Sequence, residues 1–138
     1  MTPTHLTLLR AANDALFVHG DLDAVATYFV PDYVVHLAAG RSLRGHDGIR
    51  AAVSLTRRAF SELSVEVEVF VETADRVAWQ RTLRGTQTGA YHGFPASGRE
   101  IVWREMVTSR IVDGRIVEEL LVSELAERLL LGRKGVAH

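Results

Sequence analysis

The stretch SVEVEVFVE, residues 64–72, alternates between apolar and mostly acidic side chains. Successive side chains of a β-strand point to opposite faces of a sheet, so its four valines share one face. The glutamates and Phe70 share the other face. This pattern predicts a strand of an antiparallel sheet that is buried on one side and solvated on the other.

Two later stretches repeat this period of two, and a turn follows them. Residues 76–86 place on one face Val77, Trp79, Arg81 and Leu83. Residues 101–111 place on one face Ile101, Trp103, Glu105, Val107 and Ile111. The dipeptide Asp113-Gly114 is typical of a two-residue hairpin turn, so a further strand is expected over residues 115–124.

The first 60 residues and the end of the chain show the helical period instead. We expect helices over residues 3–19, 21–29 and 46–60, and a short helix over residues 124–131. This order predicts a single α+β domain over residues 1–138, with three N-terminal helices packed on a strongly curved antiparallel sheet and a short C-terminal helix. Such a sheet is expected to enclose a pocket between itself and the helices, where a small molecule could bind.

Composition and charge argue against several classes of function. The 16 basic residues balance 17 acidic ones, giving a formal net charge of −1, so nucleic acid is not an expected partner. The chain has no cysteine, no group with metal-ligand spacing and no glycine-rich phosphate loop, so we expect neither disulfides nor a metal nor a cofactor. With no apolar run approaching roughly 20 residues and no signal peptide, a cytoplasmic protein without membrane contact is expected.

Glu105 most needs an explanation, because it would lie among apolar side chains on the buried face of its strand. A buried carboxylate is costly unless it is paired or protonated. One interpretation makes Glu105 a general acid or base in a desolvated pocket. The other makes it a structural ion pair with Arg81, if their two strands are neighbours. The sequence leaves both interpretations open.

Other residues are candidates for the same pocket. His36, at the end of the segment PDYVVH, could assist Glu105 as a proton donor, or could be a rim residue bonded to the backbone. His92 could close over a ligand or could belong only to a hairpin end. The residues that could bind a substrate are Trp79, Trp103, Tyr28, Arg81, His92 and Leu121. For the two tryptophans, ordinary core packing is the alternative.

Five short motifs carry a resemblance to a known family. They are PDYVVH (31–36), GHDGIRAAV (45–53), GTQTG (85–89), GFPASGR (93–99) and SRIVDGRIVEE (109–119). With the order of elements, they resemble the SnoaL-like polyketide cyclases of the nuclear-transport-factor-2-like superfamily over nearly the whole chain. The resemblance implies a cone-shaped α+β barrel. It leaves the reaction open, because the superfamily includes cyclases, isomerases, epoxide hydrolases, dehydratases and non-catalytic modules.

The resemblance also implies positions for the catalytic residues of the cyclases. Their last-strand aspartate corresponds to Leu121, counted forward from Asp113-Gly114, and a leucine cannot transfer a proton. Their histidine on the preceding strand corresponds to Val107, and the nearby amide to Glu105. Glu105 is then the ionisable group left at the centre of that face, and Glu119, which shares the strand parity of Leu121, is the reserve candidate.

These observations favour a cofactor-independent enzyme of secondary metabolism that cyclises, isomerises or dehydrates an apolar, oxygenated, polyketide-like molecule. The first alternative is a non-catalytic module of the same fold that binds a small molecule or dimerises. The second is an epoxide hydrolase or epoxide-opening cyclase in which Glu105 activates water. Phe70, Leu120 and Val122, left over on the solvent face of the sheet, suit a homodimer contact.

Overall fold

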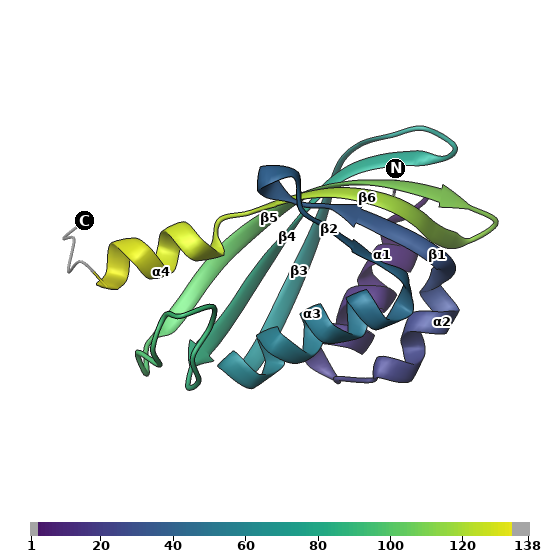
Figure 1. Cartoon of the computed structure of the whole chain (residues 1–138). Helices are drawn as coiled ribbons and strands as arrows, with labels where there is room; N and C mark the ends of the chain where they lie inside the picture. Colours follow the sequence, from purple (N-terminus) through teal and green to yellow (C-terminus); the bar gives the residue numbers. More distant parts are fainter. Residues whose placement is uncertain (1–2, 134–138) are drawn as a thin grey trace.

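The computed structural model describes residues 3–133, and Figure 1 shows its N-terminal helices on one side of an arched sheet. The α-helices are α1 (Leu6–Asn13), α2 (Val25–Tyr28), α3 (Gly45–Ala59) and α4 (Leu125–Arg133). The strands are β1 (Phe29–His36), β2 (Ser42–Arg44), β3 (Phe60–Glu72), β4 (Arg76–Gln87), β5 (Glu100–Val112) and β6 (Arg115–Ser123). The predicted arrangement of helices against one curved sheet is confirmed.

The six strands lie in the order β2-β1-β6-β5-β4-β3, so β2 and β3 are the two edges of the sheet. Four neighbouring pairs are antiparallel, but β1 runs parallel to β6. The expectation of a purely antiparallel sheet is therefore wrong in this one pair. Its cause is topological, because the period of a strand specifies which side chains share a face but not the direction of its neighbour.

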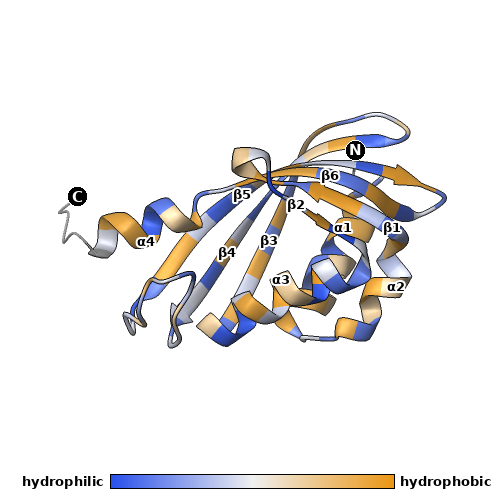
Figure 2. Cartoon of the chain, viewed as in Figure 1, coloured by the Kyte–Doolittle hydropathy of each residue, from blue (hydrophilic) through white to orange (hydrophobic). Residues whose placement is uncertain are grey.

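The face of the sheet that lies against the N-terminal helices is called the inner face here, and the other the outer face. Hydrophobic and hydrophilic residues alternate along β3, β4 and β5 (Figure 2), as the sequence period requires. The expectation that the four valines of β3 share one face is wrong for Val71, because a bulge after Val69 places Val71 opposite Ala78 on the outer face. Val77, Trp79 and Leu83 of β4 and Trp103 and Val107 of β5 are buried on the inner face. This face forms the core of the protein and carries its buried polar groups.

The register of the sheet brings specific inner-face residues side by side. Arg81 lies directly opposite Glu105, which confirms the predicted pairing of their strands. On the next pair of strands, Ser109 lies opposite Glu119. The turn between β5 and β6 is the predicted one, with positive φ angles of 51° at Asp113 and 77° at Gly114.

The helical region is less regular than predicted. A single regular helix was expected to reach residue 19, but α1 ends at Asn13 and continues as a five-residue π-helix, Asp14–Val18. The expected second helix is a 3₁₀ turn, Leu22–Ala24, followed by the short α2. The π-helix inserts an extra residue into the turn that faces the sheet, and such insertions often accompany functional sites.

Candidate active site

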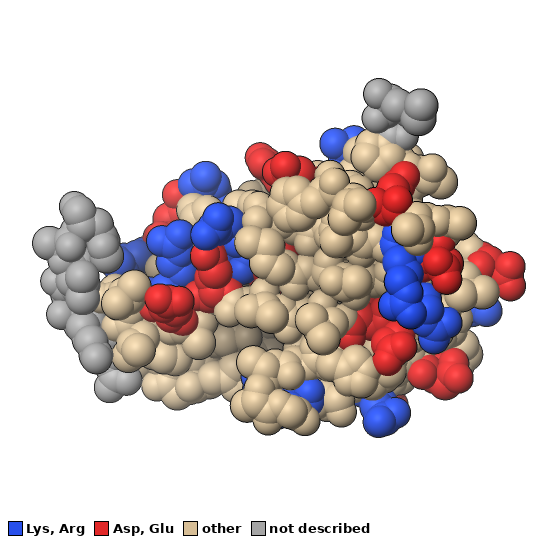
Figure 3. Space-filling view, turned by 90° about the horizontal axis from the view of Figure 1, so that it is seen from above, with Lys and Arg blue, Asp and Glu red and all other residues tan. Residues whose placement is uncertain are grey.

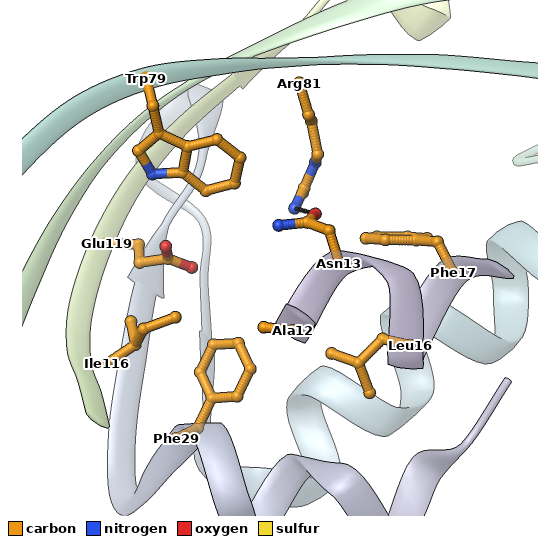
Figure 4. Close-up of a pocket in the computed structure, with 9 residues that line it drawn as sticks. All are labelled: Ala12, Asn13, Leu16, Phe17, Phe29, Trp79, Arg81, Ile116 and Glu119. Atoms are coloured by element: carbon orange, nitrogen blue, oxygen red, sulfur yellow. Dashed lines mark hydrogen bonds between the residues drawn. The ribbon is translucent and has the colours of Figure 1, made fainter. Parts of the chain in front are cut away.

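A small cavity lies between the inner face and the junction of α1 with the π-helix. Its volume is about 20 Å³, which is room for about one water molecule. Its polar lining comes from Asn13, Arg81 and Glu119, and its apolar lining includes Phe17, Phe29 and Trp79 (Figure 4). A carboxyl, an amide and a guanidinium therefore meet around one mostly apolar space.

Glu119 is a buried carboxyl held by hydroxyl groups. The Tyr33 hydroxyl donates to its Oε1 at 2.6 Å, and the Ser109 hydroxyl donates to its Oε2. Ser109 Oγ in turn accepts a hydrogen bond from Trp79 Nε1 at 2.8 Å. Within residues 3–133 no basic side chain lies within 4.0 Å of Glu119, which is 6% exposed. The protein thus keeps an acid inside its core without a cation in contact with it.

Tyr33 is fixed as a hydrogen-bond donor to Glu119. Burial, and then the nearby Glu119 carboxylate, raise the pKa of Tyr33 far above its ordinary value. The phenol therefore stays protonated at every physiological pH. Its hydrogen bond to Glu119 is available whenever the protein is folded.

Glu105 forms the ion pair that was one of the two interpretations of its position. Arg81 Nε donates to Glu105 Oε1 at 2.7 Å, and Trp103 Nε1 donates to Oε2 at 3.3 Å. Both charged side chains of the pair are 13% exposed. Glu105 is not among the residues that line the cavity. Arg81 compensates its charge directly, and Glu105 faces Arg81 and Trp103 rather than open space.

Arg81 connects the ion pair to the cavity. Besides its bond to Glu105, it donates from Nη1 to Asn13 Oδ1 at 3.0 Å, the contact drawn in Figure 4. Its Cζ lies 4.8 Å from the ring centre of Phe17 and 5.7 Å from that of Trp79. In the described part of the chain, Nη2 has no hydrogen-bond partner. Arg81 is held on several sides and has one donor group left.

His36 is not brought to Glu105. Val35 is buried on the inner face, so the next side chain along β1 points to the outer face. There His36 Nε2 lies 2.7 Å from Glu118 Oε2, and both side chains are largely exposed. The expected partnership of His36 with Glu105 is wrong in geometry, because the two lie on opposite faces of the sheet.

The other predicted site residues are divided between the cavity, the core and the surface. Trp79 lines the cavity as expected. Trp103 is fully buried, with its ring centre 4.7 Å from that of Phe60. Tyr28 is half-buried at the edge of the core and is not part of the cavity lining. His92 is exposed in the loop between β4 and β5.

Leu121 lies opposite Val107 on the inner face and packs against the core.

Three residues of the site were missed from the sequence. Ser109 lies on β5 at the same parity as Glu105, and Tyr33 lies on β1 at the same parity as Val35, so alternation could have placed both on the inner face. Asn13 is different. It reaches Arg81 at the point where α1 becomes a π-helix, and the sequence pattern carries no signal for that change.

Residues 3–133 lack two further kinds of feature. No group of three or more His, Cys, Asp or Glu side chains there could hold a metal ion. No helix in the same range is long and apolar enough to cross a membrane.

Comparisons with known proteins give a consistent family and fold. A family model described as SnoaL-like polyketide cyclase matches residues 7–129. Wild-type IdmH from Streptomyces antibioticus, a candidate polyketide cyclase, is 28% identical with a TM-score of 0.78, and the match covers 97% of this chain and 100% of that one. AclR from Streptomyces galilaeus, a candidate hydroxylase, is 26% identical with a TM-score of 0.75, and the match covers 96% of each chain.

A third structure, a candidate polyketide cyclase from Acidithiobacillus ferrooxidans, shares the fold at 20% identity, with a TM-score of 0.80 over 97% of this chain and 99% of that one. No curated protein matches the chain.

Proposed function

Because the chain belongs to the SnoaL-like polyketide cyclase family, we propose that it catalyses a cofactor-independent proton transfer, such as a cyclisation, on an apolar, oxygenated, polyketide-like molecule. In this proposal it acts in the cytoplasm, in secondary metabolism. The observation that carries the proposal is Glu119, a buried carboxyl that lines the cavity with no cation in contact among the described residues. Glu119 rather than Glu105 is the proposed acid and base.

The proposed reaction uses one carboxyl for two proton transfers. The Glu119 carboxylate takes a proton from a carbon next to a ketone, and the electrons of that C–H bond form an enolate. The enolate carbon then attacks a second carbonyl carbon of the same molecule, so a carbon–carbon bond forms and an alkoxide results. Glu119 returns its proton to the alkoxide. The sum is an intramolecular aldol cyclisation without oxidant, reductant or co-substrate.

The hydrogen bonds around Glu119 support this role. Tyr33 and Ser109 hold the two carboxyl oxygens in a fixed orientation, and Trp79 holds Ser109. A preorganised acid of this kind loses little free energy to reorientation during the reaction. Glu105 has a positioning role in the proposal, because it holds Arg81 at the cavity.

The size of the cavity sets a condition on the proposal. A pocket for a drug-sized ligand usually has several hundred Å³, whereas this cavity has about 20 Å³. A polyketide-like ligand therefore requires side chains to move. Leu16 and Phe17 line the cavity from the π-helix, whose hydrogen bonding departs from the regular α-helical pattern, so we propose that this segment makes the room.

Deuterium exchange at a carbon next to a ketone tests the proposed acid and base. Flat cyclic ketones such as 2-tetralone are incubated with the protein in D₂O and followed by NMR. We expect the wild type to accelerate exchange, and Glu119→Gln to slow it by about 10²- to 10⁴-fold, the usual contribution of a general base. Glu118→Gln is the matched control, because Glu118 is the adjacent residue, on the outer face. Equal exchange rates in the two variants would exclude Glu119 as the base.

A non-catalytic binding module is the second candidate, and two observations favour it. Arg81 neutralises Glu105, and Leu121, the residue that the resemblance matches to the family's catalytic aspartate, cannot transfer a proton. A module of this kind would bind flat ketones without any acceleration of exchange by the wild type. The same NMR experiment therefore separates the two candidates.

We also propose a homodimer that pairs through the outer face. Apolar side chains that are 41–63% exposed lie there: Phe70, Val71, Met106, Leu120 and Val122. Seen from above, the middle of the molecule is largely free of charged side chains, which gather toward its two ends (Figure 3). A second copy is the occupant whose surface has the same apolar centre. Light scattering at micromolar concentration should give the dimer mass for the wild type and the monomer mass for Leu120→Glu, and a monomeric wild type would contradict the proposal.

A further inference from the structure

We infer that Arg81 binds the oxygen of the ligand through Nη2, and that the ligand is a planar ketone or phenol whose oxygen becomes negatively charged during the reaction. This inference rests on the proposed proton transfer and adds a binding group and a ligand class to it. The juxtaposition of Arg81, Asn13 and Glu119 around one cavity carries the inference.

The guanidinium is fixed in orientation by two other partners. Glu105 accepts from Nε at 2.7 Å and Asn13 accepts from Nη1 at 3.0 Å, so the plane of the guanidinium is fixed by two hydrogen bonds. Asn13 is itself fixed, because its Nδ2 donates to the Leu9 carbonyl at 2.8 Å. Nη2 is the nitrogen without a partner within residues 3–133, and Arg81 lines the cavity. A ligand oxygen that reaches Nη2 would meet a donor whose orientation is already fixed.

The charges around the cavity suit an oxyanion that exists only during the reaction. Before proton transfer, the negative charge is on Glu119, while Arg81 and Glu105 compensate each other. After transfer, Glu119 is neutral and the charge is on the ligand oxygen. The total charge in this part of the core does not change. A buried cationic donor stabilises the new position of the charge more strongly than water would, because the surroundings are of low polarity.

The aromatic neighbours of Arg81 define the shape of the ligand. The rings of Phe17 and Trp79 lie 4.8 and 5.7 Å from Cζ. A ligand oxygen that reaches Nη2 therefore brings its carbon skeleton close to the indole of Trp79, which lies on β4 and not on the segment that is proposed to move. A flat, unsaturated ring packs there better than a branched or saturated chain. The ligand class is a cyclic enol or phenol, of the kind that an aromatic polyketide presents.

A series of substituted 2-naphthols tests the inference, because these planar phenols resemble the enolate and fluoresce differently when ionised. Remote nitro or cyano groups lower the pKa of the naphthol hydroxyl stepwise without changing its shape near the oxygen. The reference protein is Glu105→Gln/Glu119→Gln, in which Arg81 stays but both carboxylates are neutral. We expect this reference to bind the most acidic naphthol at least about tenfold more tightly than the least acidic one at neutral pH.

Adding Arg81→Gln to the reference should abolish this dependence and weaken binding of the most acidic naphthol by about tenfold or more. The reference leaves Arg81 without its anion, whereas the triple variant has no buried unpaired charge, so circular dichroism checks that both proteins are folded before binding is compared. Arg84→Gln in the reference is the matched control, because Arg84 lies on the same strand but is exposed and paired with Glu100. It should leave the affinities unchanged.

Three outcomes would overturn the inference: no binding of any naphthol to the reference, affinities that are independent of naphthol pKa, or a dependence that survives loss of Arg81. These outcomes are separate from the exchange experiment on ketones. If Arg81 binds the acidic naphthols while Glu119→Gln exchanges ketones as fast as the wild type, the oxyanion site stands and the proposed base is wrong. If exchange depends on Glu119 but naphthol binding ignores Arg81, only the present inference fails.

Discussion

Glu105 and Glu119 lie on the same inner face of one sheet, yet their surroundings differ in kind. Glu105 contacts a guanidinium and an indole N–H, and it lies away from the cavity. Glu119 contacts two hydroxyl groups, and it lies at the cavity. A cation offsets the charge of a carboxylate directly, whereas hydroxyl groups bond to a carboxylate without carrying a charge of their own. This difference supports the proposal that Glu105 stabilises and orients Arg81, while Glu119 transfers the proton.

The largest loss of unfolding free energy is expected from breaking the ion pair between Arg81 and Glu105. Arg81→Met leaves a buried carboxylate without its cation, and breaking a buried pair from one side costs about 3–5 kcal/mol. Urea unfolding followed by circular dichroism measures the loss. The double variant Arg81→Met/Glu105→Leu should recover most of it, since no unpaired charge then remains. A loss no greater than that of Arg84→Met would mean that the pair is not buried in solution.

A smaller loss of unfolding free energy is expected from removing a hydrogen bond to Glu119. Ser109→Ala removes one donor to Glu119 and the acceptor of the Trp79 indole N–H, both of them buried. Leaving such a group unpaired costs about 1–3 kcal/mol of unfolding free energy. Thr108→Ala, the neighbouring residue on the exposed side of β5, is the control and should change stability little. Equal effects of the two substitutions would show that the network around Ser109 contributes nothing.

At high pH, the buried Tyr33 hydroxyl should make the free energy of unfolding fall with pH. In the unfolded chain this phenol ionises near pH 10, whereas in the folded protein its pKa is raised and it stays protonated. The unfolded state therefore binds fewer protons above about pH 10, and stability falls there by about 1.4 kcal/mol per pH unit from this group. Tyr33→Phe should remove that share of the slope in urea unfolding between pH 9 and 11. An unchanged slope would place the phenol in water.

The smallest effect is expected for an ion pair on the exposed side of the same strands. Arg84 and Glu100 pair at 2.8 Å, but their side chains are 54% and 59% exposed. Arg84→Gln should therefore cost at most about 1 kcal/mol, and the cost should shrink in high salt. Comparing it with Arg81→Met in the same buffer measures what burial adds to an arginine–glutamate pair. A cost similar to that of Arg81→Met would remove the distinction between the two faces.

Much of this sheet could be predicted because a period of two fixes the face of every residue on a strand. That rule placed Arg81 and Glu105 on the same face, and their pairing was one of two open interpretations, conditional on β4 and β5 being neighbours. The fold family followed from motifs that are mostly turns. Alternation does not predict which helix or strand lies over each face of the sheet. The hydroxyl contact of Glu119 comes from Tyr33 on β1, whose parallel pairing with β6 has no local signal.

His36 and Asn13 illustrate two different reasons for error. The parity of β1 places His36 beside Glu118 on the outer face, and a strand starting at Phe29 would have predicted this. Its assignment to the pocket failed because the strand was taken as a short segment ending at a rim. Asn13 reaches Arg81 where a π-helix begins, and such a helix depends on packing against the sheet rather than on residue pattern.

The parallel pairing of β1 with β6 also determines when, during synthesis of the chain, the site can form. Tyr33 and Glu119 are 86 positions apart, and nearly all the other strands are synthesised between them. During translation, β1 emerges from the ribosome long before its partner. The edge of β1 that pairs with β6 stays unpaired until β6 has been synthesised. The proposed acid can thus be assembled only after β6 has emerged, and a nascent chain that stalls before β6 carries α1 to α3 and the other strands but not Glu119.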